Sequence, residues 1–232
     1  MKNLCLLFLI LFSFNSFSQN LEARTSYDLL QGATLKGIEP ESIDLSTFKG
    51  SIYPEENFSK GQITDKLSNK TIPSFLRYDA YNDAFQMNET ASTTGYSYLK
   101  KEVSLGLTYN NTAFVYTTFV NEEGNSKLGY LQELVSLEGT TIYYRMEKII
   151  TLPQKGANSY EPDSPGKINS NDYYVVKRGD KPAMAEKINK KNITSFFPKE
   201  QGKRVLQITK SEKLKFRDSK DMITLTKLLS KG

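Results

Sequence analysis

Residues 73–87 constrain the fold of this chain most, because they have the pattern of two strands folded back on each other. Side chains alternate between the two faces of a strand, so Arg77 and Asp79 belong to one face and Tyr78 to the other. Residues 81–83, Tyr-Asn-Asp, supply a turn, since Asn and Asp bond the local backbone and tolerate left-handed angles. The sequence therefore predicts a β-hairpin to which the rest of a sheet is added.

Several further strands are expected along the chain. Residues 112–120 are β-branched and aromatic almost throughout, which is typical of a strand. Residues 129–137 and 140–150 flank a tight Glu-Gly connection and predict a long hairpin. Two more strands are expected at 173–177 and 183–188. A chain with this many short strands and turns is predicted to be rich in sheet.

The last part of the chain has a different pattern. Residues 153–172 are rich in Pro, Asn and Ser, which predicts a long mobile loop. From Lys190 the apolar residues follow a helical period, and helices are expected from Glu200 and after a cap at Asp218 or Ser219. Their apolar stripes need a face or end of the sheet to cover.

The predicted fold class is α+β: mainly antiparallel sheet, as a twisted sandwich or partly rolled barrel, with C-terminal helices packed on it. Residues 1–18 are expected to be a signal peptide and 19–49 an N-terminal arm. Residues 50–232 are expected to form a single β-rich domain with a helical tail over 190–232.

The chain begins like a secretory signal peptide. Lys2 is a short basic region, residues 4–12 are an apolar run, and Ser16-Phe-Ser18 is a small-x-small site before Gln19. A transmembrane anchor needs about 20 apolar residues, and this run is shorter. We therefore expect export to the periplasm, the outer membrane or the extracellular space, with no membrane-spanning segment after cleavage.

The residue inventory excludes several chemistries. Cys5 is the only cysteine and falls within the apolar run, and the chain has no histidine. After cleavage no disulfide can form, so burial alone must hold the fold. Cys/His zinc sites, cysteine nucleophiles and Ser-His-Asp triads are excluded. No metal and no cofactor is expected, and a calcium loop is disfavoured by the spacing of the acids.

Charge is segregated along the chain. Residues 21–176 hold 14 Lys and Arg against 20 Asp and Glu, whereas residues 177–232 hold 16 against 6. In an exported protein this basic tail favours an anionic lipid surface, a glycan or an acidic envelope protein as partner, and not nucleic acid. The alternative is that the lysines are the solvated faces of short helices.

Three segments together resemble a protein family. They are Gly50-Ser-Ile-Tyr53, the core at 76–83 and the tail from Tyr173. The chain is similar to a family of uncharacterised secreted bacterial proteins with an initial Gly-Ser/Thr-x-Tyr segment, an Arg-Tyr-Asn-x-Tyr-Asn-Asp/Glu core and a Lys-Lys-containing helical tail. The resemblance covers roughly Gly50 to Leu229, and Asp79 stands where Asn is common. It implies export by a Gram-negative bacterium and one continuous domain, but no activity.

The acids of the hairpin are the first candidates for chemistry. Asp79 and Asp83, with Glu133, would support a carboxylate-dependent hydrolase if their carboxylates faced each other about 5–9 Å apart across a cleft. The alternative is structural: Arg77 pairs with an acid across the hairpin, while Asn82 and Asp83 build the turn.

Tyrosines are the second candidate feature. Nine lie on expected strands, and an aromatic platform can bind sugars or peptides; they are Tyr96, Tyr98, Tyr109, Tyr116, Tyr130, Tyr143, Tyr144, Tyr173 and Tyr174. The alternative is ordinary sheet composition. Residues 178–180 form the adhesion tripeptide Arg-Gly-Asp, which a turn between two strands also explains.

The sequence favours a non-enzymatic, exported binding or envelope-associated module. The alternatives are the hydrolase and a purely structural envelope protein. The candidate binding residues are Arg77, Tyr78, Asp79, Tyr81, Asp83, Tyr143 and Tyr173.

Overall fold

The computed structural model describes residues 34–35, 45, 47–156 and 164–231. The expected signal peptide and most of the N-terminal arm lie outside these residues. No helix in the described ranges has both the length and the apolar character needed to cross a membrane.

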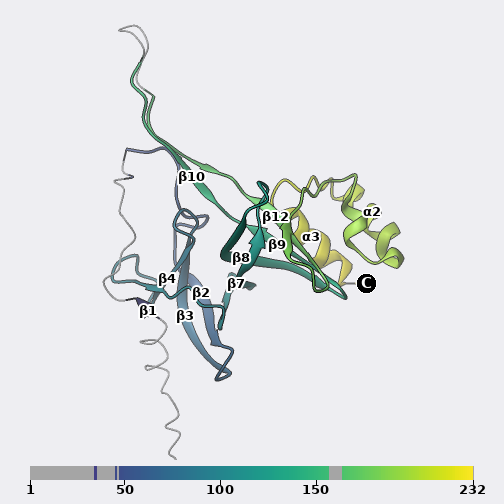
Figure 1. The fold of residues 1–232 in the computed structure, drawn as a ribbon, viewed down its shortest axis with the longest axis horizontal. Helices are drawn as coiled ribbons and strands as arrows, with labels where there is room; N and C mark the ends of the chain where they lie inside the picture. Colours follow the sequence, from purple (N-terminus) through teal and green to yellow (C-terminus); the bar gives the residue numbers. More distant parts are fainter. Residues whose placement is uncertain (1–33, 36–44, 46, 157–163, 232) are drawn as a thin grey trace, which may run out of the picture. The chain divides into compact units, whose positions relative to one another are not determined.

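Within the described ranges, eleven strands form one sheet and two more form a ribbon (Figure 1). The strands are β1 (Thr34–Leu35), β2 (Ser59–Asp65), β3 (Lys70–Asp79), β4 (Ala84–Asn88), β5 (Ser97–Leu99), β6 (Leu105–Tyr109), β7 (Thr112–Val120), β8 (Ser126–Leu137), β9 (Thr140–Arg145), β10 (Lys148–Thr151), β11 (Lys167–Ser170), β12 (Tyr173–Arg178) and β13 (Ala183–Ala185). The helical elements are η1 (Ile193–Phe196), η2 (Lys199–Gln201), α2 (Gly202–Ser211) and α3 (Ser219–Leu229). The protein is therefore β-rich with two C-terminal α-helices, which confirms the α+β class.

Part of the sheet closes on itself as a barrel. Strands β7, β13, β12, β9 and β8 pair in that order, and β8 pairs back to β7. The β7–β13 pair is parallel and the other pairs of this ring are antiparallel. Of the two expected arrangements, the rolled barrel is the one observed.

Strand β7 joins the barrel to the remaining strands. Residues 114–120 pair with β8 along one edge. On the other edge, residues 112–115 pair with β6 and residues 119–120 pair with β13. Because each partner takes a different part of this edge, β7 belongs both to the barrel and to the sheet that continues through β6, β2, β3, β4, β5 and β1.

The predicted hairpin over 73–87 is confirmed as β3 and β4. Its register pairs Arg77 with Gln86 and Tyr78 with Phe85. Both faces are buried near the turn, since Leu76 and Tyr78 are inaccessible on one face and Arg77 is inaccessible on the other. The polar face of this hairpin therefore does not face solvent.

Three groups of buried side chains hold the fold. An aromatic group on β3, β4, β7 and β8 has ring centroids 4.9–6.3 Å apart and consists of Tyr78, Phe85, Phe114 and Tyr130. A second group lies on four strands of the barrel and contains Phe119, Leu131, Val175 and Ala183. A third joins β8, β9 and β12 to the helices and includes Ile142, Val176, Val205, Met222 and Leu225.

The prediction of a long loop over 153–172 is wrong for the described part. Strands β10 and β11 pair antiparallel, from Lys148 with Ser170 to Thr151 with Lys167, and a further bridge joins Gln154 to Ser164. The Pro-rich composition of this segment predicted a loop, but the segment forms part of a two-stranded ribbon. The strands of this ribbon carry β-branched isoleucines at their centre, which favours a strand.

The predicted end of the chain is confirmed. Helix α3 begins after Asp218, whose carboxylate accepts a hydrogen bond from the Lys220 amide at 3.0 Å. Such a cap satisfies one of the free amides of the first turn. Pro198 follows the short 3₁₀ helix η1 and immediately precedes η2.

Candidate functional site

Arg77 lies in a closed aromatic box. Its guanidinium donates from Nε and Nη2 to Gln86 Oε1 at 2.9 and 2.7 Å, and from Nη1 to the Glu56 carbonyl at 3.0 Å. The rings of Tyr53 and Phe58 lie 4.0 and 4.6 Å from its central carbon. The prediction that Arg77 pairs with an acid across the hairpin is therefore wrong, because its cross-strand partner is the amide of Gln86.

Asp79 organises the turn that follows β3. Its carboxylate accepts hydrogen bonds from the backbone amides of Tyr81 and Asn82 at 3.1 and 2.9 Å, and from Asn82 Nδ2 at 2.8 Å. Burial raises the pKa of the Asp79 carboxyl, and the hydrogen bonds from Asn82 and Tyr81 oppose this shift. All of these contacts are local, which is the behaviour of a turn residue.

Asp83 lies at the centre of a second polar cluster. It accepts a hydrogen bond from the Tyr78 hydroxyl at 2.6 Å, one from the Tyr130 amide at 3.2 Å and an ion-paired bond from Arg145 Nη1 at 2.5 Å. Burial, and then the Asp83 charge, raise the pKa of the Tyr78 hydroxyl well above its usual value. Burial alone would lower the pKa of Arg145, but the charges of Tyr78 and Asp83 outweigh it and raise that pKa.

The three acids make different contacts. The carboxylate partners of Asp79 and those of Asp83 are different groups, and Glu133 lies on β8 opposite Tyr143. Of three cavities on the described part of the chain, none is lined by any of the three acids. Within the fold, Asp79 holds the turn that follows β3, and Asp83 forms the ion pair with Arg145.

Among the described residues, no group of three or more Asp, Glu, His or Cys side chains could hold a metal ion.

The tyrosines do not form one exposed platform. Five of the nine are buried, namely Tyr109, Tyr116, Tyr130, Tyr144 and Tyr174. The other four are half-buried, namely Tyr96, Tyr98, Tyr143 and Tyr173. Aromatic residues on these strands therefore mainly fill the core.

The two candidate residues of the barrel line different cavities. Tyr143 lines a cavity of about 430 Å³ with Lys177 and Lys181, whereas Tyr173 lines another of about 430 Å³ with Lys215 and Arg217. None of the hairpin candidates lines either cavity. The seven predicted residues thus line no common cavity, although Tyr173 pairs on the sheet with Arg145, the ion-pair partner of Asp83.

The Arg-Gly-Asp tripeptide is the turn that its sequence predicts. Arg178 ends β12, forms an ion pair with Glu186 and lies 5.3 Å from the ring of Phe196. Gly179 follows with a φ of 53°, a left-handed angle that glycine adopts without strain. The arginine is thus engaged within its own fold.

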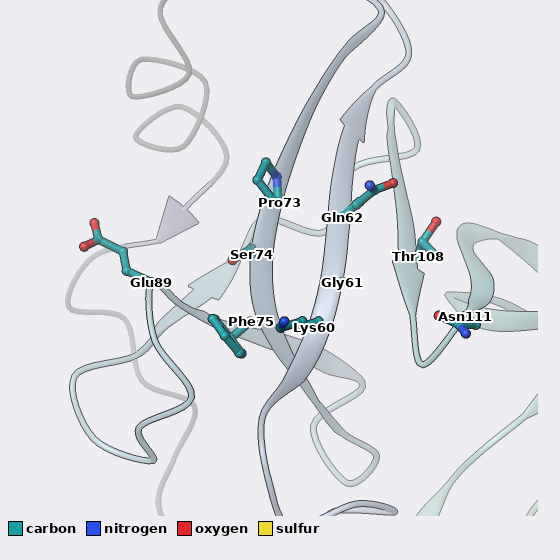
Figure 2. Close-up of a pocket in the computed structure, with 9 residues that line it drawn as sticks. All are labelled: Lys60, Gly61, Gln62, Pro73, Ser74, Phe75, Glu89, Thr108 and Asn111. Atoms are coloured by element: carbon teal, nitrogen blue, oxygen red, sulfur yellow. The ribbon is translucent and has the colours of Figure 1, made fainter.

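The candidate site that the structure does present is an open groove on β2, β3 and β6. Its volume is about 640 Å³, and its lining residues come from three strands and two loops (Figure 2). They are Lys60, Gly61, Gln62, Pro73, Ser74, Phe75, Glu89, Thr108 and Asn111.

The strand register explains why this groove exists. Lys60 pairs with Phe75, and Gln62 pairs with both Pro73 and Thr108, so these side chains share one face of the sheet. The same face is closed farther along β3, where the aromatic box covers Arg77. Among the described residues, the groove is the part of this face that stays open.

Gly61 keeps the three strands close together beneath the groove. A Cβ atom added at Gly61 would lie 2.5 Å from the Thr108 carbonyl oxygen and 2.8 Å from Leu76 Cδ1. Larger residues are therefore excluded at this position.

Sequence reasoning missed the groove entirely. The signal was present in β2, where polar Lys60 and Gln62 alternate with Gly61 and Ile63 in the pattern of a half-exposed strand.

Comparisons of the chain with protein-family models, with curated proteins and with solved structures gave no match. The resemblance to secreted bacterial proteins therefore stays a prediction.

Proposed function

We propose that this protein is an exported, non-enzymatic binding module of the cell envelope, and that its groove on β2, β3 and β6 binds a segment of a neutral glycan. The observation that carries the proposal is the lining of this groove, which combines neutral hydrogen-bonding groups with an apolar floor. Export is proposed from the composition of residues 1–18.

The polar lining suits a ligand with many hydroxyls. Gln62 and Asn111 offer amides and Thr108 offers a hydroxyl, and all three line the cavity, whereas the Ser74 hydroxyl donates to the Asn88 carbonyl at 3.2 Å. Amides and hydroxyls both donate and accept hydrogen bonds, as sugar hydroxyls do. These three residues come from β2, β6 and the β6–β7 turn, so they can contact a ligand that lies across the strands.

The apolar part of the lining supports the same ligand class. Phe75 and Pro73 alternate with Ser74 along β3 and present a ring and an apolar edge. The ring face of an aromatic residue packs well against the C–H face of a sugar. A volume of about 640 Å³ also lies within the range usual for small-ligand sites, about 300–1,000 Å³.

Charge in the groove is balanced. Lys60 and Glu89 are its only charged lining residues and have opposite signs. Figure 2 shows Glu89 at one side of the groove and Lys60 near its centre, with Asn111 at the other side. A ligand held mainly by ionic contacts is therefore a poorer fit than a neutral one.

The proposal is tested by screening the purified protein against an array of neutral glycans and then measuring affinity by calorimetry. We expect binding of at least one glycan, with a loss of about tenfold or more for Phe75→Ala, since truncating a central aromatic contact typically costs over 1 kcal/mol. Gln62→Ala, at an exposed position, should weaken binding without affecting the fold.

Ser136→Ala is the matched control, because this residue is exposed on β8 and lines none of the three cavities. Failure to bind any neutral glycan would refute the proposal. So would unchanged affinity in both groove variants.

A further inference from the structure

The two C-terminal helices repeat one exposed pattern. Helix α2 presents Lys203, Leu206 and Lys210, and α3 presents Lys220, Ile223 and Lys227. In each helix the apolar residue lies three positions after one lysine and four before the next, so all three side chains share one face. All six residues are exposed, with Leu206 at 41% and Ile223 at 39%.

These two apolar residues are not needed by the core. Helix α2 buries Val205 and Thr209 on its inner face, and α3 buries Met222 and Leu225. Leu206 and Ile223 lie outside this buried set, between lysines. Exposed apolar residues within a basic surface are a feature of helices that lie on membranes.

The helices form one structural unit. They lie against each other (Figure 1), and Arg204 Nη2 of α2 donates a hydrogen bond to the Leu228 carbonyl of α3 at 3.1 Å. Both helices pack on the same core group, which also includes strand residues such as Ile142 and Val176. Each basic face is therefore preformed, and no helix has to fold on binding.

The charge of this region complements an anionic surface. Residues 187–231 contain thirteen lysines and arginines and four acids, a net charge of +9. Lysines close to a membrane attract anionic headgroups. Their long aliphatic side chains let the ammonium groups reach phosphates beside an apolar layer. A soluble polyanion offers no apolar layer to Leu206 and Ile223, whereas a lipid surface does.

We infer that the surface formed by these two helices, with Lys203, Leu206, Lys210, Lys220, Ile223 and Lys227, docks onto an anionic phospholipid membrane. The lysines contact lipid phosphates, and the two apolar side chains enter the boundary between headgroups and acyl chains. This binding is independent of the glycan groove, because no residue of the surface lines the groove.

Co-sedimentation with vesicles tests this inference on the whole protein. We expect little binding to phosphatidylcholine vesicles and strong binding once phosphatidylglycerol is included, weakening with salt because exposed charges are screened. Lys203→Ala with Lys210→Ala should weaken binding roughly 25-fold, at about fivefold for each lysine. Leu206→Ser with Ile223→Ser keeps the charge constant and should also weaken it.

Lys177→Ala with Lys181→Ala is the matched control, because it removes the same charge from exposed positions outside the helices. It should change vesicle binding much less than the Lys203 and Lys210 variant. Phe75→Ala should bind vesicles normally, which separates a failure here from a failure of the glycan proposal.

Three outcomes would overturn the inference. The first is equal binding to neutral and anionic vesicles, and the second is an equal loss in the control and the helix variant. The third is an unchanged affinity of the Leu206 and Ile223 variant together with complete competition by soluble polyphosphate, which would identify a polyanion site instead of a membrane surface.

Discussion

Arg145 Nη1 donates to Asp83 Oδ1 at 2.5 Å and to the Tyr130 carbonyl at 3.0 Å, so one buried guanidinium joins the β3–β4 turn to two strands of the barrel. The side chains of Arg145 and Asp83 are 8% and 14% exposed. Such a pair is costly to break from one side, because the remaining charge is left buried without its partner.

We therefore expect Arg145→Met to lower the free energy of unfolding by about 3–5 kcal/mol. Asp83→Leu combined with Arg145→Met should cost less than the sum of the two single changes, since the double variant leaves neither charge buried alone. Urea unfolding measures all three variants. Arg217→Met, at an exposed position, is the control, and a loss below about 1 kcal/mol for Arg145→Met would contradict the assignment.

Gly129 makes room for this ion pair. A Cβ atom at Gly129 would lie 2.7 Å from Asp83 Oδ2 and 2.9 Å from Arg145 Nη1. We expect Gly129→Ala to destabilise the protein by about 1–3 kcal/mol through overpacking, and to cost less in an Asp83→Ala background. Gly202→Ala meets no atom within 4 Å and should be neutral or stabilising. Equal costs of Gly129→Ala in both backgrounds would rule out the clash.

The contribution of Arg77 to stability depends on the planar shape of its guanidinium. Lysine cannot donate twice to Gln86 Oε1 and does not stack between rings as arginine does. Arg77→Lys should cost about 2–3 kcal/mol in thermal or urea unfolding, although the charge is kept. The half-buried ion pair of Arg178 gives the comparison, and Arg178→Lys should cost under about 1 kcal/mol. Similar costs for the two changes would show that shape is unimportant at Arg77.

Asp79 should give the protein a distinctive pH dependence. Its pKa is raised above 3.8 on folding, so the folded protein holds this proton more tightly than the unfolded chain. The resulting stabilisation is present below pH 3.8 and is lost as the pH rises through the folded pKa. The advantage of wild type over Asp79→Asn should therefore shrink with rising pH.

Urea unfolding of wild type and Asp79→Asn across the acid range checks this sign. The exposed Asp180→Asn change serves as the control and should show no such trend. An advantage of wild type that grows with pH would mean that the hydrogen bonds from Asn82 outweigh burial at Asp79.

The local parts of this fold could be predicted from sequence. The hairpin over 73–87 and the cap at Asp218 depend on neighbouring residues, so alternation and capping patterns suffice to place them. The partner of Asp83 could not be predicted in this way, because Arg145 is 62 residues away and only the closure of the barrel brings it near.

The candidate site was harder to predict for a related reason. Alternation places Arg77 and Phe75 on one face of β3, but it does not say which part of that face is covered. Tyr53 and Phe58 arrive from another segment and bury Arg77, while Phe75 stays accessible in the groove. The sequence-based prediction therefore selected Arg77, on the buried half of β3, and not Phe75 on the accessible half.

One edge of β7 pairs with both β6 and β13, and this affects the order in which the strands can pair as the chain is made. Its partners β6 and β8 are its neighbours in the chain, whereas β13 is made much later and is separated from β7 by a large loop to be closed. Until Ala183 reaches Phe119, the last residues of β7 carry unpaired amides and carbonyls on one side. An unpaired edge of this kind is a place where a strand of a second molecule can pair, so the three residues of β13 protect the chain against mispairing once they close the barrel.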